Sequence, residues 1–168
     1  MKKSIALLAA LVLMLTLAAC SAQKPAATPA PAAPTLRFTT TDRDGSTVDE
    51  TILRGHKLVM LNFWEPWCPP CVKEMPELEK LYRDYADKGL LILGVYSTEG
   101  QEQEVDNVLS DSGTSYPILR YSKDFDSFKT GYVPTTLFVD GEGTILSELL
   151  VGSRDYAGWE ELIANTLK

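Results

Sequence analysis

The sequence has few of the residues from which metal sites and disulfide frameworks are built. It contains three cysteines and one histidine in 168 residues, and no second CxxC accompanies the pair Cys68 and Cys71. A zinc or iron site needs further cysteine or histidine ligands, whereas His56 lies well upstream in a predicted loop. The composition therefore argues against a metal centre, and we expect no metal and no other cofactor.

Basic side chains are also scarce. The chain has 16 Lys and Arg against 23 Asp and Glu, for a formal net charge of -7. Without residues 1–19 the count is 14 basic against 23 acidic, or -9. Because phosphate binding needs a basic face, we expect no nucleic-acid partner.

The apolar run near the N-terminus is too short to span a bilayer. Ile5 to Leu17 contains thirteen residues, whereas a transmembrane helix needs about 20. Lys2 and Lys3 precede the run, an arrangement typical of an export signal. The rest of the chain is therefore expected outside the reducing cytosol, where disulfide chemistry is permitted.

The end of this run has a second feature. The letters LAAC, Leu17 to Cys20, resemble the bacterial lipobox, in which the cysteine receives a lipid and the peptide is cut before it. This resemblance implies a signal peptide over residues 1–19, lipidation of Cys20 and a lipid-anchored tether, rich in Ala and Pro, over residues 20–35. An ordinary signal peptide cut after a small residue is the alternative.

Residues 36–168 are enough for one domain, and two apolar runs predict the centre of an α/β sheet. Leu58–Trp64 and Gly89–Ser97 are typical of strands buried on both faces, and each is followed by a segment with helical spacing. This order predicts parallel neighbouring strands. We also expect hairpin turns at Asp42–Gly45 and Asp140–Gly143, a short strand in YPILR and a closing helix in the last fifteen residues.

The stretch WEPWCPPCVKEMP places Cys68 at the start of the first predicted helix. Backbone NH groups of a first helical turn lack partners and favour negative charge, so a cysteine there is biased toward thiolate. If Cys68 is the N-cap, Pro69 suits the first helical position and Cys71 lies one turn further, near enough to close a disulfide. The spacing predicts a redox pair in which Cys68 attacks a substrate disulfide and Cys71 resolves the mixed disulfide.

Other interpretations of the pair are weaker. A disulfide with only a structural role is one alternative, but a bridge over three residues removes little entropy from the unfolded chain and so adds little to the stability of the fold. A copper chaperone of the Sco type would need a three-residue gap between the cysteines and a histidine late in the chain. A peroxiredoxin would need a threonine three residues before the attacking cysteine, where this chain has Glu65.

From about Leu36 onward the chain resembles the thioredoxin superfamily, and more narrowly its TlpA/ResA-type extracytoplasmic thiol-disulfide oxidoreductases. NFWEPWCPPC resembles their active site with Trp67 before the first cysteine, Pro76 occupies the place of their kinking helix proline, and GYVPTTLFVDGEG resembles the segment with their cis-proline. The resemblance implies a thioredoxin fold: a central mixed β-sheet flanked by helices, an N-terminal β-hairpin and a TlpA-type strand-helix insertion before Pro134.

The resemblance also implies roles for individual residues. Pro134 should follow a cis bond from Val133 and lie against Cys68, and an extended substrate segment should contact Trp67, Val133 and Pro134.

The proton acceptor is expected on a helix. The buried aspartate of cytosolic thioredoxin falls on Asn62, an amide that cannot take a proton. Glu74, one turn beyond Cys71, is then the candidate to relay the resolving proton, with its pKa raised by partial burial. A solvated helix glutamate is the alternative.

Charge around the pair predicts the direction of electron flow. Pro69 and Pro70 have no NH group to donate to the Cys68 thiolate, and Glu65 and Glu74 disfavour negative charge nearby. A less stabilised thiolate means a more stable disulfide and a more reducing couple, so a reductant is favoured.

These observations together predict a monomeric, lipid-anchored thiol-disulfide oxidoreductase on the outer side of the bacterial cell membrane. The resemblance implies electrons from a membrane carrier of the CcdA or DsbD kind. It also implies protein disulfides as substrates, in apocytochrome c or in an enzyme such as methionine sulfoxide reductase. A disulfide-forming oxidase and a non-catalytic client-binding module are the alternatives.

Overall fold

The structure, a computed structural model, describes residues 34–167. The strands are β1 (Thr39–Thr41), β2 (Thr47–Asp49), β3 (Leu58–Phe63), β4 (Leu90–Tyr96), β5 (Ile118–Arg120), β6 (Thr135–Val139) and β7 (Leu150–Val151). The helices are α2 (Pro69–Tyr85), α3 (Glu102–Ser112) and α4 (Tyr156–Thr166), with short 3-10 helices η1 (Glu50–Leu53), η2 (Ala86–Lys88) and η3 (Lys123–Phe128). The predicted signal peptide, Cys20 and all but the last two residues of the predicted tether lie outside the described residues.

A five-stranded mixed sheet in the order β5-β4-β3-β6-β7 forms the centre of residues 34–167. β3, β4 and β5 run parallel, whereas β6 and β7 are antiparallel to their neighbours. Every residue of β3 and β4 is buried, as their continuous apolar runs predict. The expected mixed sheet and its preceding hairpin, β1 with β2, are confirmed.

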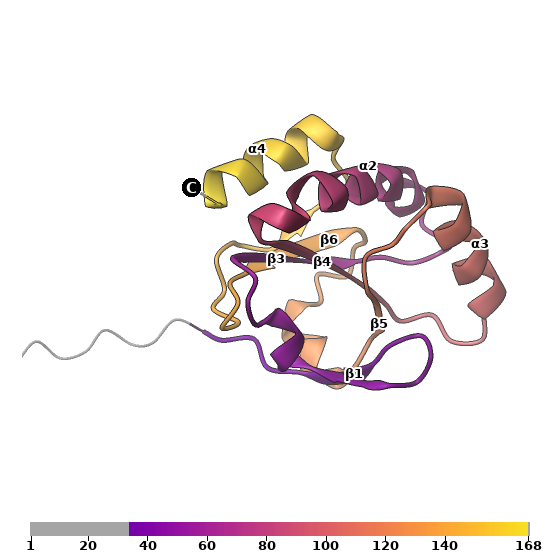
Figure 1. Cartoon of the computed structure of the whole chain (residues 1–168). Coiled ribbons are helices and arrows are strands. Elements are labelled where there is room, and N and C mark those ends of the chain that lie inside the picture. The colour runs from indigo at the N-terminus through magenta and orange to yellow at the C-terminus, as the bar shows by residue number, and fades with distance from the viewer. Residues whose placement is uncertain (1–33, 168) are drawn as a thin grey trace, which may run out of the picture. The chain divides into compact units, whose positions relative to one another are not determined.

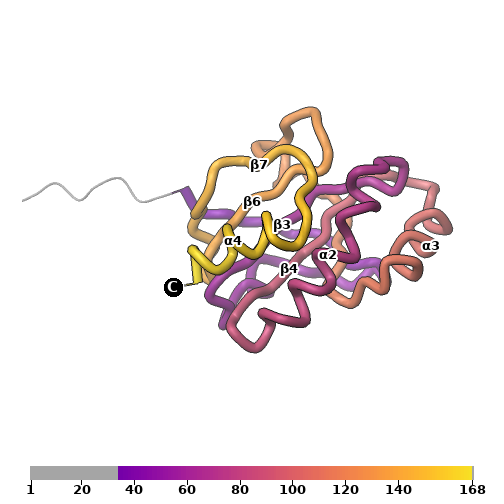
Figure 2. The backbone as a smooth tube through the Cα atoms, turned by 90° about the horizontal axis from the view of Figure 1, so that it is seen from above, coloured from indigo at the N-terminus to yellow at the C-terminus, as the bar shows by residue number. Residues whose placement is uncertain are grey.

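The two faces of the sheet are covered differently. α2, α3 and α4 pack on one face, and Figures 1 and 2 show α2 and α4 side by side over it. The hairpin, η1 and η3 contribute to the core on the other face, where Figure 1 shows β1. Among residues 34–167, no helix combines the length and the apolar character needed to cross a bilayer.

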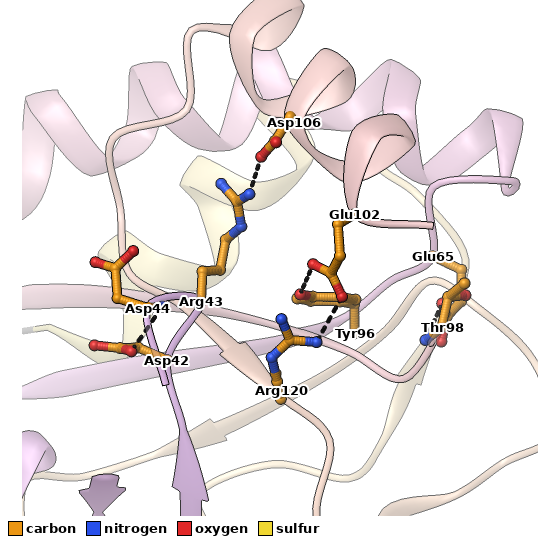
Figure 3. A network of polar contacts seen from close by, with 9 residues as sticks. All are labelled: Asp42, Arg43, Asp44, Glu65, Tyr96, Thr98, Glu102, Asp106 and Arg120. Atoms are coloured by element: carbon orange, nitrogen blue, oxygen red, sulfur yellow. Dashed lines mark hydrogen bonds and ion pairs between the residues drawn. The ribbon is translucent and has the colours of Figure 1, made fainter. Parts of the chain in front are cut away.

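The expected extra helix and strand before Pro134 are present as α3 and β5, and β5 extends the sheet beside β4. Ion pairs hold this insertion in place, as Figure 3 shows. Arg120 on β5 pairs with Glu102 on α3 at 2.7 Å, and Arg43 in the turn of the N-terminal hairpin pairs with Asp106 on α3. The hairpin and the insertion are therefore tied to each other on one side of the sheet.

The expected C-terminal hairpin is present, but its ladder is interrupted after the turn. Its turn lies at Asp140–Gly143, as predicted, with the Gly143 amide donating to the Asp140 carbonyl at 3.0 Å. After the turn, however, the Phe138 amide donates to the Ser147 hydroxyl at 3.0 Å, and β7 contains only Leu150–Val151. The returning chain forms a short strand because a side chain, not a backbone carbonyl, takes this amide.

Candidate active site

Cys68 and Cys71 lie where the chain leaves β3 and enters α2. α2 begins at Pro69 with Cys68 as its N-cap, as predicted. The two sulfurs form a disulfide with Cα atoms 5.3 Å apart, and both cysteines are buried. The Cys71 amide donates to the Cys68 sulfur at 3.2 Å. Since Pro69 and Pro70 have no NH group, this amide is the first one in the helix that can do so.

The segment before β6 closes the site from the other side. The peptide bond between Val133 and Pro134 is cis, which confirms the expectation. The Val133 carbonyl oxygen lies 3.6 Å from the Cys68 sulfur. A disulfide sulfur carries no hydrogen, so this is a close contact and not a hydrogen bond. The fold thus places the outer cysteine against a backbone carbonyl of a segment far along the chain.

Glu74 points into the protein, which excludes the solvated helix glutamate. It is only 2% exposed, and its Oε1 accepts a hydrogen bond from the Asn62 amide at 3.0 Å. Its Oε2 accepts from the backbone NH of Arg154 at 3.1 Å and from the indole of Trp159 at 3.3 Å. Burial raises the pKa of Glu74 above its ordinary value, although these hydrogen bonds act in the opposite direction.

A polar cavity of about 290 Å³ reaches Glu74 from the surface. Its walls come from α2 and from the chain entering α4, and they include Lys73, Glu77, Ser153, Arg154 and Asp155. A proton held by the buried carboxyl therefore has a polar route to water that does not pass over the disulfide.

An apolar groove of about 270 Å³ opens beside the cis bond. Trp67 and Tyr132, with exposed fractions of 63% and 72%, contribute large aromatic surfaces to it. Phe63, Phe128 and Val133 are among its other lining residues. Predicted substrate-contacting residues Trp67 and Val133 therefore line one groove, and Pro134 follows directly.

Glu65 has a position that the sequence interpretation missed. The sequence suggested only a charge near Cys68, whereas the structure buries its carboxylate against the loop after β4. That carboxylate accepts hydrogen bonds from the backbone NH groups and hydroxyls of Ser97 and Thr98. Figure 3 shows Glu65 against Thr98. The one signal in the sequence was an acidic residue shortly before Trp67 and Cys68. The hydrogen bonds to Glu65 could not be predicted from it, because their donors lie more than thirty residues away.

Of the other residues considered from the sequence, His56 is not brought to this site. His56 precedes β3 and so lies at the opposite end of that strand from Cys68. Cys20 lies outside the described residues. Within residues 34–167, no group of three or more His, Cys, Asp and Glu side chains is arranged to hold a metal ion.

Comparison with known proteins gives consistent matches. The profile of the AhpC/TSA family matches residues 29–147. The thiol-disulfide oxidoreductase ResA of Oceanobacillus iheyensis is 39% identical over 112 residues, which are 66% of this chain and 57% of that protein. ResA of Bacillus thuringiensis is 32% identical over 115 residues, 67% of this chain and 65% of that protein. The match thus spans less than two thirds of these relatives.

Solved structures share the fold. A thiol:disulfide interchange protein of the thioredoxin family from Chlorobium tepidum superposes with a TM-score of 0.71 at 26% identity, covering 84% of this chain and all of that one. StoA from Bacillus subtilis superposes with a TM-score of 0.62 at 22% identity, covering 78% of this chain and 98% of that one. The architecture of residues 34–167 is therefore the thioredoxin fold.

Proposed function

This chain belongs to the AhpC/TSA family, and from that premise we propose that it is a thiol-disulfide oxidoreductase of the TlpA/ResA type that reduces protein disulfides. One observation carries the proposal: the Cys68-Cys71 disulfide caps α2 directly against the Val133 carbonyl. A peroxiredoxin-type activity is disfavoured because Glu65 stands in place of the required threonine and its carboxylate is engaged with Ser97 and Thr98.

The reaction begins with the reduced pair. The Cys68 thiolate attacks one sulfur of the client disulfide, that disulfide breaks, and the released client sulfur takes up a proton. Cys71 then loses its proton and attacks the Cys68 sulfur of the mixed disulfide. The Cys68-Cys71 disulfide forms, the second client sulfur leaves as a thiol, and two electrons have moved to the client.

Glu74 is the residue that takes the Cys71 proton in this proposal. A buried carboxyl with a raised pKa is nearer to the operating pH than an exposed one and is a better general base and acid there. The polar cavity beside Lys73 and Asp155 then lets the proton exchange with water.

The direction of electron flow follows from the surroundings of Cys68. Its helix offers the Cys71 amide alone within hydrogen-bond reach, since Pro69 and Pro70 cannot donate. The Val133 carbonyl oxygen presents a partial negative charge to the same sulfur. Both features leave the Cys68 thiolate weakly stabilised and favour the disulfide, so the couple is reducing.

Clients bind as extended segments. The Val133 backbone beside Pro134 can pair with a client strand, and the apolar groove at Trp67 and Tyr132 can accept a side chain next to the client cysteine.

The N-terminal sequence supports an extracytoplasmic location. An export signal over residues 1–19 and the lipobox at Cys20 lead to a lipid-anchored domain on a tether of residues 20–35. In this setting a membrane carrier of the CcdA or DsbD type reduces the monomeric domain. Its clients are apocytochrome c or an oxidised reductase of the methionine sulfoxide type.

Trapping with Cys71→Ser tests the proposal. The mixed disulfide at Cys68 cannot be resolved in this variant, so client proteins should accumulate on it and turnover should be lost. Cys68→Ser is the matched control and should trap nothing. Undiminished activity of Cys71→Ser would indicate a binding module. A reduction potential of about -120 mV, the value of a strong disulfide donor, would indicate an oxidase.

A further inference from the structure

The indole of Trp67 is held at one edge although most of the side chain is exposed. Trp67 immediately precedes Cys68 and lines the apolar groove. Its Nε1 donates a hydrogen bond of 3.1 Å to the Thr98 hydroxyl, on the loop that follows β4. An exposed tryptophan usually samples several rotamers, whereas one tethered at Nε1 presents a defined face.

The hydroxyl that receives this bond is itself oriented. A threonine hydroxyl has a single hydrogen, and Thr98 gives it to Oε2 of Glu65. The remaining lone pairs of the Thr98 oxygen can therefore only accept, and one of them faces the indole NH of Trp67. A carboxylate in this position makes the hydroxyl an obligatory acceptor for Trp67.

Glu65 is fixed in turn by donors from one loop. Each of its two oxygens accepts one backbone NH and one hydroxyl, the NH distances being 2.9 Å from Ser97 and 3.1 Å from Thr98. None of the ion pairs found in residues 34–167 includes Glu65. Hydrogen-bond donors of Ser97 and Thr98 therefore satisfy this buried carboxylate, and their geometry defines where its oxygens lie.

We propose that Glu65 and Thr98 are positioning residues that hold the Trp67 indole as a fixed wall of the groove and thereby set the affinity for peptide clients. The inference rests on the proposed function and assigns a specificity role to residues outside the sulfur chemistry. The side-chain hydrogen bonds of the two residues go to Trp67 and to the loop after β4 and not to the cysteines, although the Glu65 backbone carbonyl accepts one from the Cys68 amide at 3.1 Å. Because the wall is ordered before binding, the client does not bear the entropy cost of ordering Trp67.

Thr98→Val and Thr98→Ser test the inference in the full chain. Valine keeps the branched shape and removes the hydroxyl, whereas serine keeps the hydroxyl and is the matched control. Each variant is reduced beforehand and mixed with an excess of either an oxidised peptide containing a disulfide and flanking residues, or hydroxyethyl disulfide. KM and kcat here are the half-saturating concentration and the limiting rate of this single turnover. The small disulfide reaches Cys68 without filling the groove.

The expected result is selective. Thr98→Val should raise the peptide KM about fivefold, the effect of one lost hydrogen bond, while kcat remains unchanged. The reaction with hydroxyethyl disulfide and the reduction potential should match the wild type. The NMR signal of the Trp67 indole NH should exchange with solvent faster in Thr98→Val and at the wild-type rate in Thr98→Ser.

Two results would overturn the inference. One is an unchanged peptide KM in Thr98→Val even though faster indole exchange shows that the bond is lost. The other is an equal loss of rate with both disulfides or a shifted potential, which would mean that Thr98 only stabilises the active-site loop. If the wild type reduces neither disulfide, the proposed function has failed, and the indole exchange still tests whether Thr98 holds Trp67.

Glu65→Gln supplies a second variant. A carboxamide presents an NH2 group where one carboxylate oxygen accepts two donors, so Ser97 or Thr98 must lose its partner. We expect a larger rise in peptide KM than in Thr98→Val. A wild-type KM in a folded Glu65→Gln protein would count against the role of Glu65. If this variant does not fold, the Thr98 pair decides the matter.

Discussion

The side-chain amide of Asn62 on β3 donates a 3.0 Å hydrogen bond to the carboxylate of Glu74 on α2. By resemblance, the strand position of Asn62 carries the buried acid in cytosolic thioredoxin. In this protein the buried acid is Glu74 on the helix, and the strand residue donates a hydrogen bond to it. The strand and helix that form the active site thus share one buried polar contact.

Loss of the Glu74 carboxyl should slow the resolving step. In Glu74→Gln, Cys71 has no general base, and the rate at which the mixed disulfide resolves should fall about 100-fold at neutral pH. Rapid chemical quench of a preformed mixed disulfide, followed over pH 4 to 9 in steps of about one unit, measures this rate. Glu77→Gln is the matched control because Glu77 lies on the same helix and lines the same cavity. An identical pH profile for both variants and the wild type would refute the role of Glu74.

The raised pKa of Glu74 should also appear in stability. The native state binds the Glu74 proton more tightly than the unfolded chain, because burial raises the pKa. The free energy of unfolding should therefore decrease as the pH rises from the ordinary glutamate pKa to the raised one, and this decrease should be missing in Glu74→Gln. Urea unfolding of the oxidised protein across this pH window measures it. Equal slopes for Glu74→Gln and the control Glu77→Gln would contradict the assignment.

Removing the amide of Asn62 should raise the pKa of Glu74 further. The Asn62 hydrogen bond favours the charged carboxylate and so lowers the pKa against the effect of burial. In Asn62→Ala the pH step in mixed-disulfide resolution should move to higher pH. Thr136→Val is the control, since Thr136 bonds Asn62 but makes no hydrogen bond to Glu74. A step that stays in place in Asn62→Ala, or moves equally in both variants, would argue against the contact.

The second proline between the cysteines should set the reduction potential. An N-cap side chain accepts from the second or third helical NH, and here Cys68 accepts only from Cys71 because Pro70 has no NH. Pro70→Ala adds that donor, stabilises the Cys68 thiolate and should make the potential more oxidising by about 30 mV, a tenfold change in the equilibrium. Pro69→Ala is the matched control, because the first helical NH does not reach the cap. Equilibration with glutathione buffers measures the reduction potentials of both variants. Equal potentials for Pro70→Ala and Pro69→Ala would contradict this explanation.

Local signals in the sequence were sufficient for much of this fold. The apolar run of β3 and the proline after Cys68 predict the strand and the start of the active-site helix, because each acts within a few residues. The turn at Asp140–Gly143 is of the same kind. The interruption after it was not predictable, since it depends on the Ser147 side chain meeting the Phe138 amide across the hairpin.

The active site also combines features that the sequence predicted with features that it left open. The CxxC spacing and the capping position of Cys68 were readable from the sequence because a helix start is a local structure. Whether Glu74 faced inward remained open, since this depends on Asn62 from β3 and on Arg154 and Trp159 from around the start of α4.

The sequence by itself determined the redox pair, its place at a helix N-terminus and the succession of the main strands and helices along the chain, because backbone preference and hydrophobic periodicity act over short stretches. Only the tertiary structure decided which charged side chains are buried and what satisfies them. Glu65 looks like an ordinary surface acid in the sequence, and only the family resemblance pointed to burial of Glu74. Their burial depends on hydrogen-bond donors that the fold brings from distant segments, and a buried carboxylate is tolerated only where such donors meet it.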